Sequence, residues 1–355
     1  MARSDKIVQI VSLNQTTLEP NGSYLTLQSP SSSLEISSSS ADTTVFGSGQ
    51  FSQSLPTIFM HSMSGSQWIR SVAGYNCDVK LGGDPIAFTG EAMSLVSGTT
   101  YRITDATKNY FDPNTDVAVF DGATPLTAGE DYTVNHLFGE VTLNVAPSDA
   151  VTVDGASIPT TVFGSFTSAS VTHSAASSDI TTFRSAQADN GFASYRSELL
   201  TVDLEAAGFY SEADNTLDVM KDRDNLLLEI DWTGEGDLVS RGIFRVSTIS
   251  QDGDVGSTEN ASVSFTISGP EDVIPYGFQF SANSVASESF QLVLNTWING
   301  EYLGFRYAPD GLDATYYDGV ACITDASMST STEGITEMSI EFQGHKELEE
   351  VVPVT

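Results

Sequence analysis

The chain has 355 residues with 47 acidic and only 14 basic side chains, which gives a formal net charge of −33 at pH 7. Binding to nucleic-acid phosphates requires clustered lysine and arginine side chains, which this chain lacks. Its net negative charge would also repel an anionic membrane. The composition therefore excludes ordinary DNA or lipid binding. With 40% hydrophobic residues the chain is too apolar to be disordered, and its length allows two or three domains.

The N-terminal sequence MARSDKIVQIVSLNQ lacks the basic-then-apolar pattern of a signal peptide, and no apolar run is long enough to span a bilayer. We therefore expect a soluble product made in a cytoplasm. The two cysteines, Cys77 and Cys322, have no metal-type spacing. Without a secretory signal, they are predicted to be buried free thiols.

Apolar residues mostly alternate with Ser, Thr and Gly or form short runs, which is typical of many short strands. Between about residues 84 and 157, closely spaced alternating segments predict a small all-β domain inserted into a larger one. These segments are residues 101–104, 116–122, 131–134, 140–145 and 151–155. The overall class is mainly β.

Only two stretches have a helical period. The first covers about residues 214–225, with Leu217, Met220 and Val219 on one face. The second covers about residues 288–298 and offers Phe290, Leu292, Leu294 and Trp297 to a core. Both are predicted to be short helices.

Two internal repeats predict the architecture. The pattern Asp-x-Thr-x-Phe-x-Ser-x-Gln occurs at residues 42–50 and again at 179–187, an offset of 137. A second repeat has an offset of 77, after which two residues are lost before matching strands at 262–269 and 338–344. Its matched pairs are Leu217 and Leu294, Leu226 and Leu303, Leu228 and Phe305, Gly234 and Gly311, and Gly242 and Gly319. Each copy predicts helix, strand, glycine turn, strand, acidic loop and strand.

The order of these modules predicts a nested arrangement of two units. Residues 1–83 and 270–355 would form the first unit, residues 158–269 the second, and residues 84–157 the inserted β domain. The nesting requires the N-terminal segment to pair with strands in 290–345 and not with strands in 213–269.

Three parts of the chain resemble the major tail tube protein of long-tailed, siphovirus-like phages and related archaeal tailed viruses, in a duplicated form. They are the Ser-rich strand leading into residues 42–48, the single helix, and the closing segments 319–329 and 336–344. The inserted stretch also resembles small β domains displayed on the exterior of such tubes.

The resemblance implies tail-tube-type units, each a β-sandwich or half-barrel with one short helix. Subunits would meet edge to edge, so that their inner sheets form one β-barrel ring around a channel. Such tubes mostly stack six units per ring, so two units per chain predict a homotrimeric ring with pseudo-sixfold symmetry. Ring closure also turns unpaired strand edges, an aggregation hazard in a monomer, into an assembly interface.

The resemblance further implies a virion structural protein that self-assembles into stacked rings in the host cytoplasm and resides in the virion tail. Its partners would be itself, the tape measure, the tail terminator and the baseplate or tip, with no membrane. During genome ejection, viral DNA would pass through the lumen without specific binding. The alternative is a β-rich surface adhesin or carbohydrate-binding module, which would share the Ser/Thr/Gly-rich strands and the acidity.

Residues 31–40 and the tail 347–355 lack a core-forming pattern. They are predicted to be arms that become ordered on contact with the next ring, or simply frayed linkers.

No catalytic, cofactor or metal site is expected, and an enzyme is the least favoured class. The histidines, His61, His136, His173 and His345, lie outside any nucleophile or metal motif, and His61 is predicted to be a partly buried structural residue. The acidic segment with Asp252, Asp254 and Glu259 lacks the ligand pattern of a calcium loop, so a solvated turn is predicted. Paired carboxylates such as Asp222 with Asp224 and Asp310 with Asp313 are expected by chance in so acidic a chain.

The acid is unevenly distributed. Residues 1–83 carry five acidic and four basic side chains, residues 84–157 carry 11 and 2, and residues 158–355 carry 31 and 8. An anionic lumen would need acid on inward faces, whereas adaptation to high salt would spread it over outward ones. The two causes therefore predict different positions for the acidic side chains.

Overall fold

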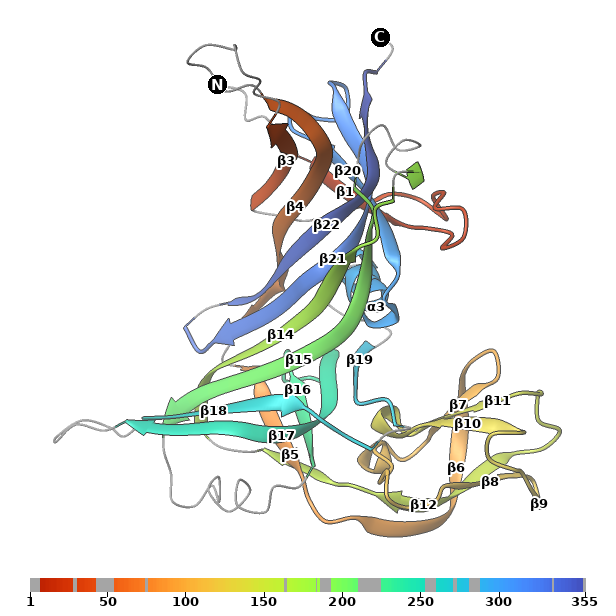
Figure 1. Ribbon diagram of the computed structural model, residues 1–355. Coiled ribbons are helices and arrows are strands. Elements are labelled where there is room, and N and C mark those ends of the chain that lie inside the picture. The colour runs from red at the N-terminus through yellow and green to blue at the C-terminus, as the bar shows by residue number, and fades with distance from the viewer. Residues whose placement is uncertain are drawn as a thin grey trace.

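The computed structural model describes residues 7–27, 31–42, 54–73, 76–162, 165–182, 184–185, 193–209, 225–252, 260–270, 273–280, 288–333 and 335–353. Within them the protein is mainly β, as predicted. A 15-stranded sheet, curled into two half-barrels, is accompanied by a 7-stranded sheet and the helix α3 (Glu288–Asn299) (Figure 1). The named strands pair with one another in antiparallel fashion.

Strands from the two ends of the chain build what we call the first half-barrel. Its order is β20 (Tyr302–Ala308), β21 (Tyr316–Ser331), β22 (Ile335–Val351), β4 (Ser54–Ala73) and β3 (Ser31–Asp42). Beyond β20 lie β1 (Ile7–Ser12) and then β2 (Leu25–Thr26). The N-terminal strands β1 and β4 thus pair with strands of the C-terminal region.

The middle of the chain builds the second half-barrel. Its order is β16 (Leu226–Asp231), β17 (Leu238–Asp252), β18 (Asn260–Ile267), β15 (Tyr195–Phe209) and β14 (Ser165–Asp179). Beyond β16 lie β5 (Asp78–Gly82) and then β13 (Thr160–Val162), while β19 (Tyr276–Phe280) pairs with the first half of β17.

Residues 77 apart take equivalent places in the two half-barrels. Leu228 lies opposite Gly242, as Phe305 lies opposite Gly319. A β-bulge between residues 246 and 248 of β17 recurs between residues 323 and 325 of β21. A bulge shifts register locally, so its recurrence at the same place fixes the alignment of the two strands.

The predicted loss of two residues before the last strand is wrong. Ile249 lies opposite Val263, and Ala326 lies opposite Ile340, so the offset of 77 continues into β18 and β22. The sequence comparison matched the glycines that end the two segments, whereas the register matches their buried side chains.

The offset of 137 relates β3 to β14. Leu34 of β3 lies opposite Met63, and Val171 of β14 lies opposite Leu204. The partner strands β4 and β15 are therefore related by an offset of 141, because the connection between the paired strands is four residues longer in the second half-barrel.

Two pairs of repeated glycines have different structural reasons. Gly234 and Gly311 adopt φ of 70° and 90°, a left-handed conformation in which a Cβ is strained. Gly242 and Gly319 instead lie under aromatic rings, since an added Cβ would come within 2.5 Å of the Phe244 ring or 2.6 Å of the Phe305 ring.

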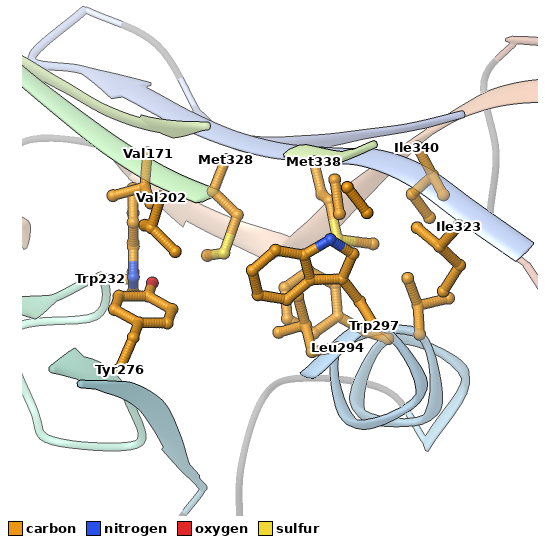
Figure 2. Packing of buried hydrophobic residues seen from close by; sticks show 14 of the residues in the cluster. Val171, Val202, Trp232, Tyr276, Leu294, Trp297, Ile323, Met328, Met338 and Ile340 are labelled. Atoms are coloured by element: carbon orange, nitrogen blue, oxygen red, sulfur yellow. The ribbon is translucent and has the colours of Figure 1, made fainter. Parts of the chain in front are cut away.

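The main core lies between the larger sheet and α3. As predicted, residues 288–298 are helical, and the helix buries Phe290, Leu294 and Trp297, while Leu292 is partly buried. Figure 2 shows Leu294 and Trp297 of α3 beneath the sheet residues Met338, Ile340 and Ile323. The predicted helix at 214–225 lies outside the described residues, except for Asn225.

The 7-stranded sheet lies beside the second half-barrel, away from β3 (Figure 1). Its order is β10 (Tyr132–Asn135), β11 (Glu140–Leu143), β7 (Thr100–Ile103), β6 (Ile86–Ser97), β12 (Val151–Ser157), β8 (Ala118–Asp121) and β9 (Thr124–Pro125). Two 3-10 turns, η2 (Ala106–Lys108) and η3 (His136–Phe138), accompany it. Phe88, Phe111, Val119, Val141 and Val153 belong to its separate core.

The prediction of arms or frayed linkers at residues 31–40 and 347–355 is wrong for residues 31–40 and 347–351. Residues 31–40 belong to β3, and β22 continues to Val351. Strand pairing with β4 and β21 supplies the order that the apolar pattern of these segments does not indicate.

Candidate assembly surfaces

One face of the larger sheet is polar and acidic. Along β14, Val171 and His173 are buried against the core, while Thr172 between them points to the opposite face and is partly exposed. The same alternation places six acidic side chains on this polar face. They are Glu35, Asp203, Glu205, Asp325, Glu337 and Glu341.

Positive charge is scarce along these strands. The sequences of β3, β14, β18 and β21 contain no lysine or arginine. Burial, and then the charge of Glu341 on the neighbouring strand, raise the pKa of Asp325. The polar face therefore presents a negative potential to whatever lies in front of it.

The polar face is hollowed where the half-barrels meet. A depression of about 240 Å³ is lined by residues of β14, β15, β18 and β21, among them Ser170, Glu205, Ser264 and Ser329. Small hydroxyl side chains line most of it. A local depression therefore lies on the side of the sheet that carries the acidic residues.

The two half-barrels are joined edge to edge by β14 and β21. Seven residue pairs connect them, from Ser168 opposite Ser331 to Ser174 opposite Asp325. On the core side this junction buries Val171, His173, Ala326 and Met328 completely. The junction is therefore a continuous part of both the sheet and the core.

Besides the outer edges of short strands such as β2 and β13, two edges of long half-barrel strands have no partner in the described part of the chain. There β3 pairs only with β4, and residues 248–252 of β17 pair only with β18. Exposed edges invite pairing with another chain.

A buried ionic cluster holds the 7-stranded sheet against the second half-barrel. Glu229 of β16 accepts hydrogen bonds from Lys80 Nζ at 2.8 Å and from Arg241 Nε at 3.2 Å. The Tyr110 hydroxyl also donates to Glu229. The Arg241 guanidinium lies 3.9 Å from the Tyr110 ring centroid, and burial lowers the Arg241 pKa to about 10.

The equivalent positions in the first half-barrel carry the opposite charges. Arg306 replaces Glu229 and Asp318 replaces Arg241, and the pair forms two hydrogen bonds of 2.8 and 2.7 Å. Arg306 is flanked by the rings of Tyr24 and Tyr316. A cross-strand ion pair thus persists at this place, while its polarity and its aromatic neighbours differ.

The sequence reasoning did not identify this cluster. Its signal is a charged residue within an apolar strand sequence, as in Leu-Leu-Leu-Glu-Ile, with an opposite charge at the same register of the next strand. That register becomes readable only once the strand pairing is known.

The structure brings His61 and His345 close together on the paired strands β4 and β22, whereas His136 and His173 lie elsewhere. His61, His173 and His345 are buried, and burial lowers the pKa of His61 and of His173 to about 4. His173 Nε2 lies 2.8 Å from the Tyr276 hydroxyl, and His345 Nδ1 accepts a hydrogen bond from the backbone N–H of Tyr195 at 3.1 Å. Burial also lowers the pKa of His136. His61, predicted to be partly buried, is only 2% exposed.

Both cysteines are free thiols, as predicted, although only Cys322 is fully buried and Cys77 is half-buried. Burial raises the thiol pKa to about 12 for Cys77 and about 11 for Cys322. Asp310 and Asp313 lie exposed between β20 and β21, whereas Asp222, Asp224, Asp254 and Glu259 fall outside the described residues. Within the described ranges, no cluster of three or more His, Cys, Asp or Glu side chains could hold a metal ion.

No protein-family model matches the chain, and no curated protein matches it either. Among solved structures, the chain is similar to one in the tail of an empty GTA particle determined by helical refinement with C6 symmetry. The sequence identity is 14% and the TM-score is 0.29, with 35% of this chain and 87% of that chain covered. These values are too low for the similarity to indicate a function.

The helix α3 has 12 residues, and the described part of the chain contains no helix long and apolar enough to cross a lipid bilayer.

Proposed function

We propose that the chain is a structural subunit of a tubular virion tail, a tail tube protein with a non-enzymatic role. The observation that carries this proposal is the junction of β14 with β21, where two similar half-barrels already meet edge to edge within one chain. Such a head-to-tail contact between similar units can be repeated between chains. The repeated contact closes into a ring if the rotation from one unit to the next is a whole fraction of a turn.

Each chain is proposed to contribute two equivalent units that arose by duplication. The common registers at offsets of 77 and 137 support this division, and so do the β1–β20 and β4–β22 pairings. We assign β5 to the second unit, since it pairs with β16 as β1 pairs with β20. Residues 84–157 remain the inserted domain.

A ring of three chains would then contain six half-barrels and have pseudo-sixfold symmetry. Stacked rings would make a tube whose lumen is lined by the polar face. Carboxylates such as Asp203, Glu205 and Glu341 would keep the phosphates of passing DNA from binding the wall. Other tail components, namely the tape measure, the terminator and the baseplate or tip, would contact the ends of the tube in the virion tail.

Electron microscopy of the purified, concentrated protein tests the proposal. We expect rings or hollow tubes, and rotational averaging together with the mass per ring should give three chains. A ring of six chains would contradict the trimer while leaving the tube in place. Persistent monomers that bind glycans on an array would contradict the tube and favour the adhesin.

A further inference from the structure

The junction between the half-barrels predicts which strands join neighbouring chains and in which register. At the internal junction, the edge strand β14 of the second half-barrel pairs with the second half of β21 of the first. By their registers, β3 occupies the place of β14, and β17 occupies the place of β21. The chain therefore ends at one side in a β14-like edge and at the other in a β21-like edge.

We propose that β3 of one chain pairs antiparallel with residues 248–252 of β17 in a second copy of the chain. Applying the offsets to the internal pairs gives the register. Thr172 opposite Ser327 becomes Glu35 opposite Ser250, and His173 opposite Ala326 becomes Ile36 opposite Ile249. The inference rests on the proposed function and specifies its interface.

The exposure of the side chains on the two edges is consistent with pairing to a second copy of the chain. Ile36 is 51% exposed, although the equivalent His173 is completely buried at the internal junction. Ile249 is partly buried against the main core, and the equivalent Ala326 is completely buried. Pairing would place the two isoleucines side by side on the core face and remove apolar surface from water.

Charge disfavours one of the two neighbouring registers. At the proposed register Glu35 faces Ser250, and Asp252 faces Ser33, so each acidic position lies opposite a serine. A slip of two residues would keep the faces matched but bring Glu35 opposite Asp252. Like charges directly opposite each other destabilise a strand pair, so this slip is disfavoured.

Because the contact joins two different strand edges, it favours a head-to-tail assembly of chains over a two-fold dimer. Two β3 edges could pair with each other around a two-fold axis, but such a dimer would leave both β17 edges without a partner. The internal junction joins two unlike edges, and its repetition between chains uses the β3 edge and the β17 edge of each chain once.

Engineered cysteines test the register. Residues directly opposite in an antiparallel pair have Cβ atoms about 4.5–5.5 Å apart, close enough for a disulfide after small shifts, whereas diagonal neighbours lie about 7–8 Å apart. We expect oxidised Glu35→Cys/Ser250→Cys rings to run as covalent multimers up to the trimer on a non-reducing denaturing gel. Each single cysteine variant should remain monomeric on the same gel.

Two matched variants control the geometry. Thr172→Cys/Ser327→Cys places the same pair at the internal junction and should close within one chain, giving a monomer of altered mobility. Ser37→Cys/Ser250→Cys is displaced by two residues on the same face and should form at least tenfold less multimer.

A second variant tests the interface without cross-linking. Ile36→Lys should abolish rings while leaving the circular dichroism and the melting temperature of the monomer unchanged. Ile86→Lys is the matched control, because Ile86 is 58% exposed but lies on β6, away from both edges, and this variant should still assemble.

The outcomes separate the inference from the proposed function. Rings in which Glu35→Cys/Ser250→Cys stays monomeric, while Thr172→Cys/Ser327→Cys closes, would overturn the register and leave the tube intact. Rings formed by Ile36→Lys would also overturn the interface. A native chain that forms no ring at any concentration would overturn both.

Discussion

Replacing Arg241 with methionine should strongly destabilise the second half-barrel and release the inserted domain. Methionine keeps an apolar stem of similar length but removes the guanidinium that pairs with Glu229 and lies over Tyr110. Both partners of this ion pair have side chains only 5% exposed. The carboxylate left behind could not be rehydrated without opening the contact between the two sheets.

The magnitude follows from that burial. Removing one partner of a buried ion pair costs about 3–5 kcal/mol, because the remaining charge is left uncompensated. Lys80 stays 2.8 Å from Glu229, which favours the lower end of that range. The lost stacking on Tyr110 adds about 1 kcal/mol. We therefore expect Arg241→Met to lower the free energy of unfolding by about 4 kcal/mol.

The equivalent pair in the first half-barrel provides the control. Arg306 and Asp318 occupy the same cross-strand position, but their side chains are 21% and 23% exposed, so water screens the charge that remains. Arg306→Met should cost about 1 kcal/mol. The double variant Glu229→Gln/Arg241→Met should be more stable than Arg241→Met alone. The reason is that glutamine removes the buried carboxylate that would otherwise lack its arginine partner.

Urea unfolding followed by tryptophan fluorescence is a suitable assay. The indole N–H of Trp232, which is completely buried, donates to Ser240 Oγ at 2.9 Å, one residue from Arg241. Limited proteolysis should cut the inserted domain of Arg241→Met first. Equal losses in Arg241→Met and Arg306→Met would refute the argument that burial sets the cost of this pair.

Three further predictions concern pH, packing and the polar face. The pKa of His61 and of His173 is about 4 in the folded state and about 6.5 when unfolded, so the unfolded chain binds more protons below pH 6.5. These two histidines should therefore each lower stability by about 2 kcal/mol from pH 7 to pH 5, and in urea titrations the fall should be about 2 kcal/mol smaller for His173→Gln. If the pH dependence of stability were the same in His173→Gln as in the native chain, the low pKa of folded His173 would be contradicted. Gly319→Ala should cost about 1–3 kcal/mol because its Cβ meets the Phe305 ring, whereas Gly83→Ala, with its nearest neighbour at 3.6 Å, should be neutral in the same thermal melts. Glu341→Lys tubes should retain DNA and release it as salt rises, and Glu130→Lys tubes should not; equal retention by both would argue against Glu341 facing the lumen.

Alternation in the sequence was sufficient to predict the class, and the repeats predicted the recurrence of strands and of a glycine turn, because buried alternation and turn glycines leave a local pattern. Gly234 and Gly311 recur since a left-handed turn needs glycine, and residues 288–298 are helical as their period indicates. Edge strands leave a weaker signal. Residues 31–40 consist mostly of serine, and only pairing with β4 makes them a strand.

The assembly surfaces could be predicted only in part. The excess of acidic residues was evident from the sequence, but their position on one face of the sheet depends on which strands are neighbours and in which register. The polarity of an ion pair also cannot be inferred from a repeat, since Glu229 and Arg306 occupy equivalent places with opposite charge. The polarity of each ion pair depends on the aromatic neighbours that other parts of the chain place beside it.

The position of the 7-stranded sheet, which we propose is an inserted domain, is compatible with the proposed ring. It enters through β5 and leaves through β13, which pair with each other. In the first half-barrel the equivalent strands β1 and β2 are joined by the short connection of residues 13–24. The insertion therefore replaces a loop next to β16, at the opposite end of the half-barrel from its edge strand β14. Since neither β3 nor residues 248–252 of β17 belong to that loop, a domain of this size can be accommodated without occupying either edge that we propose to join neighbouring chains.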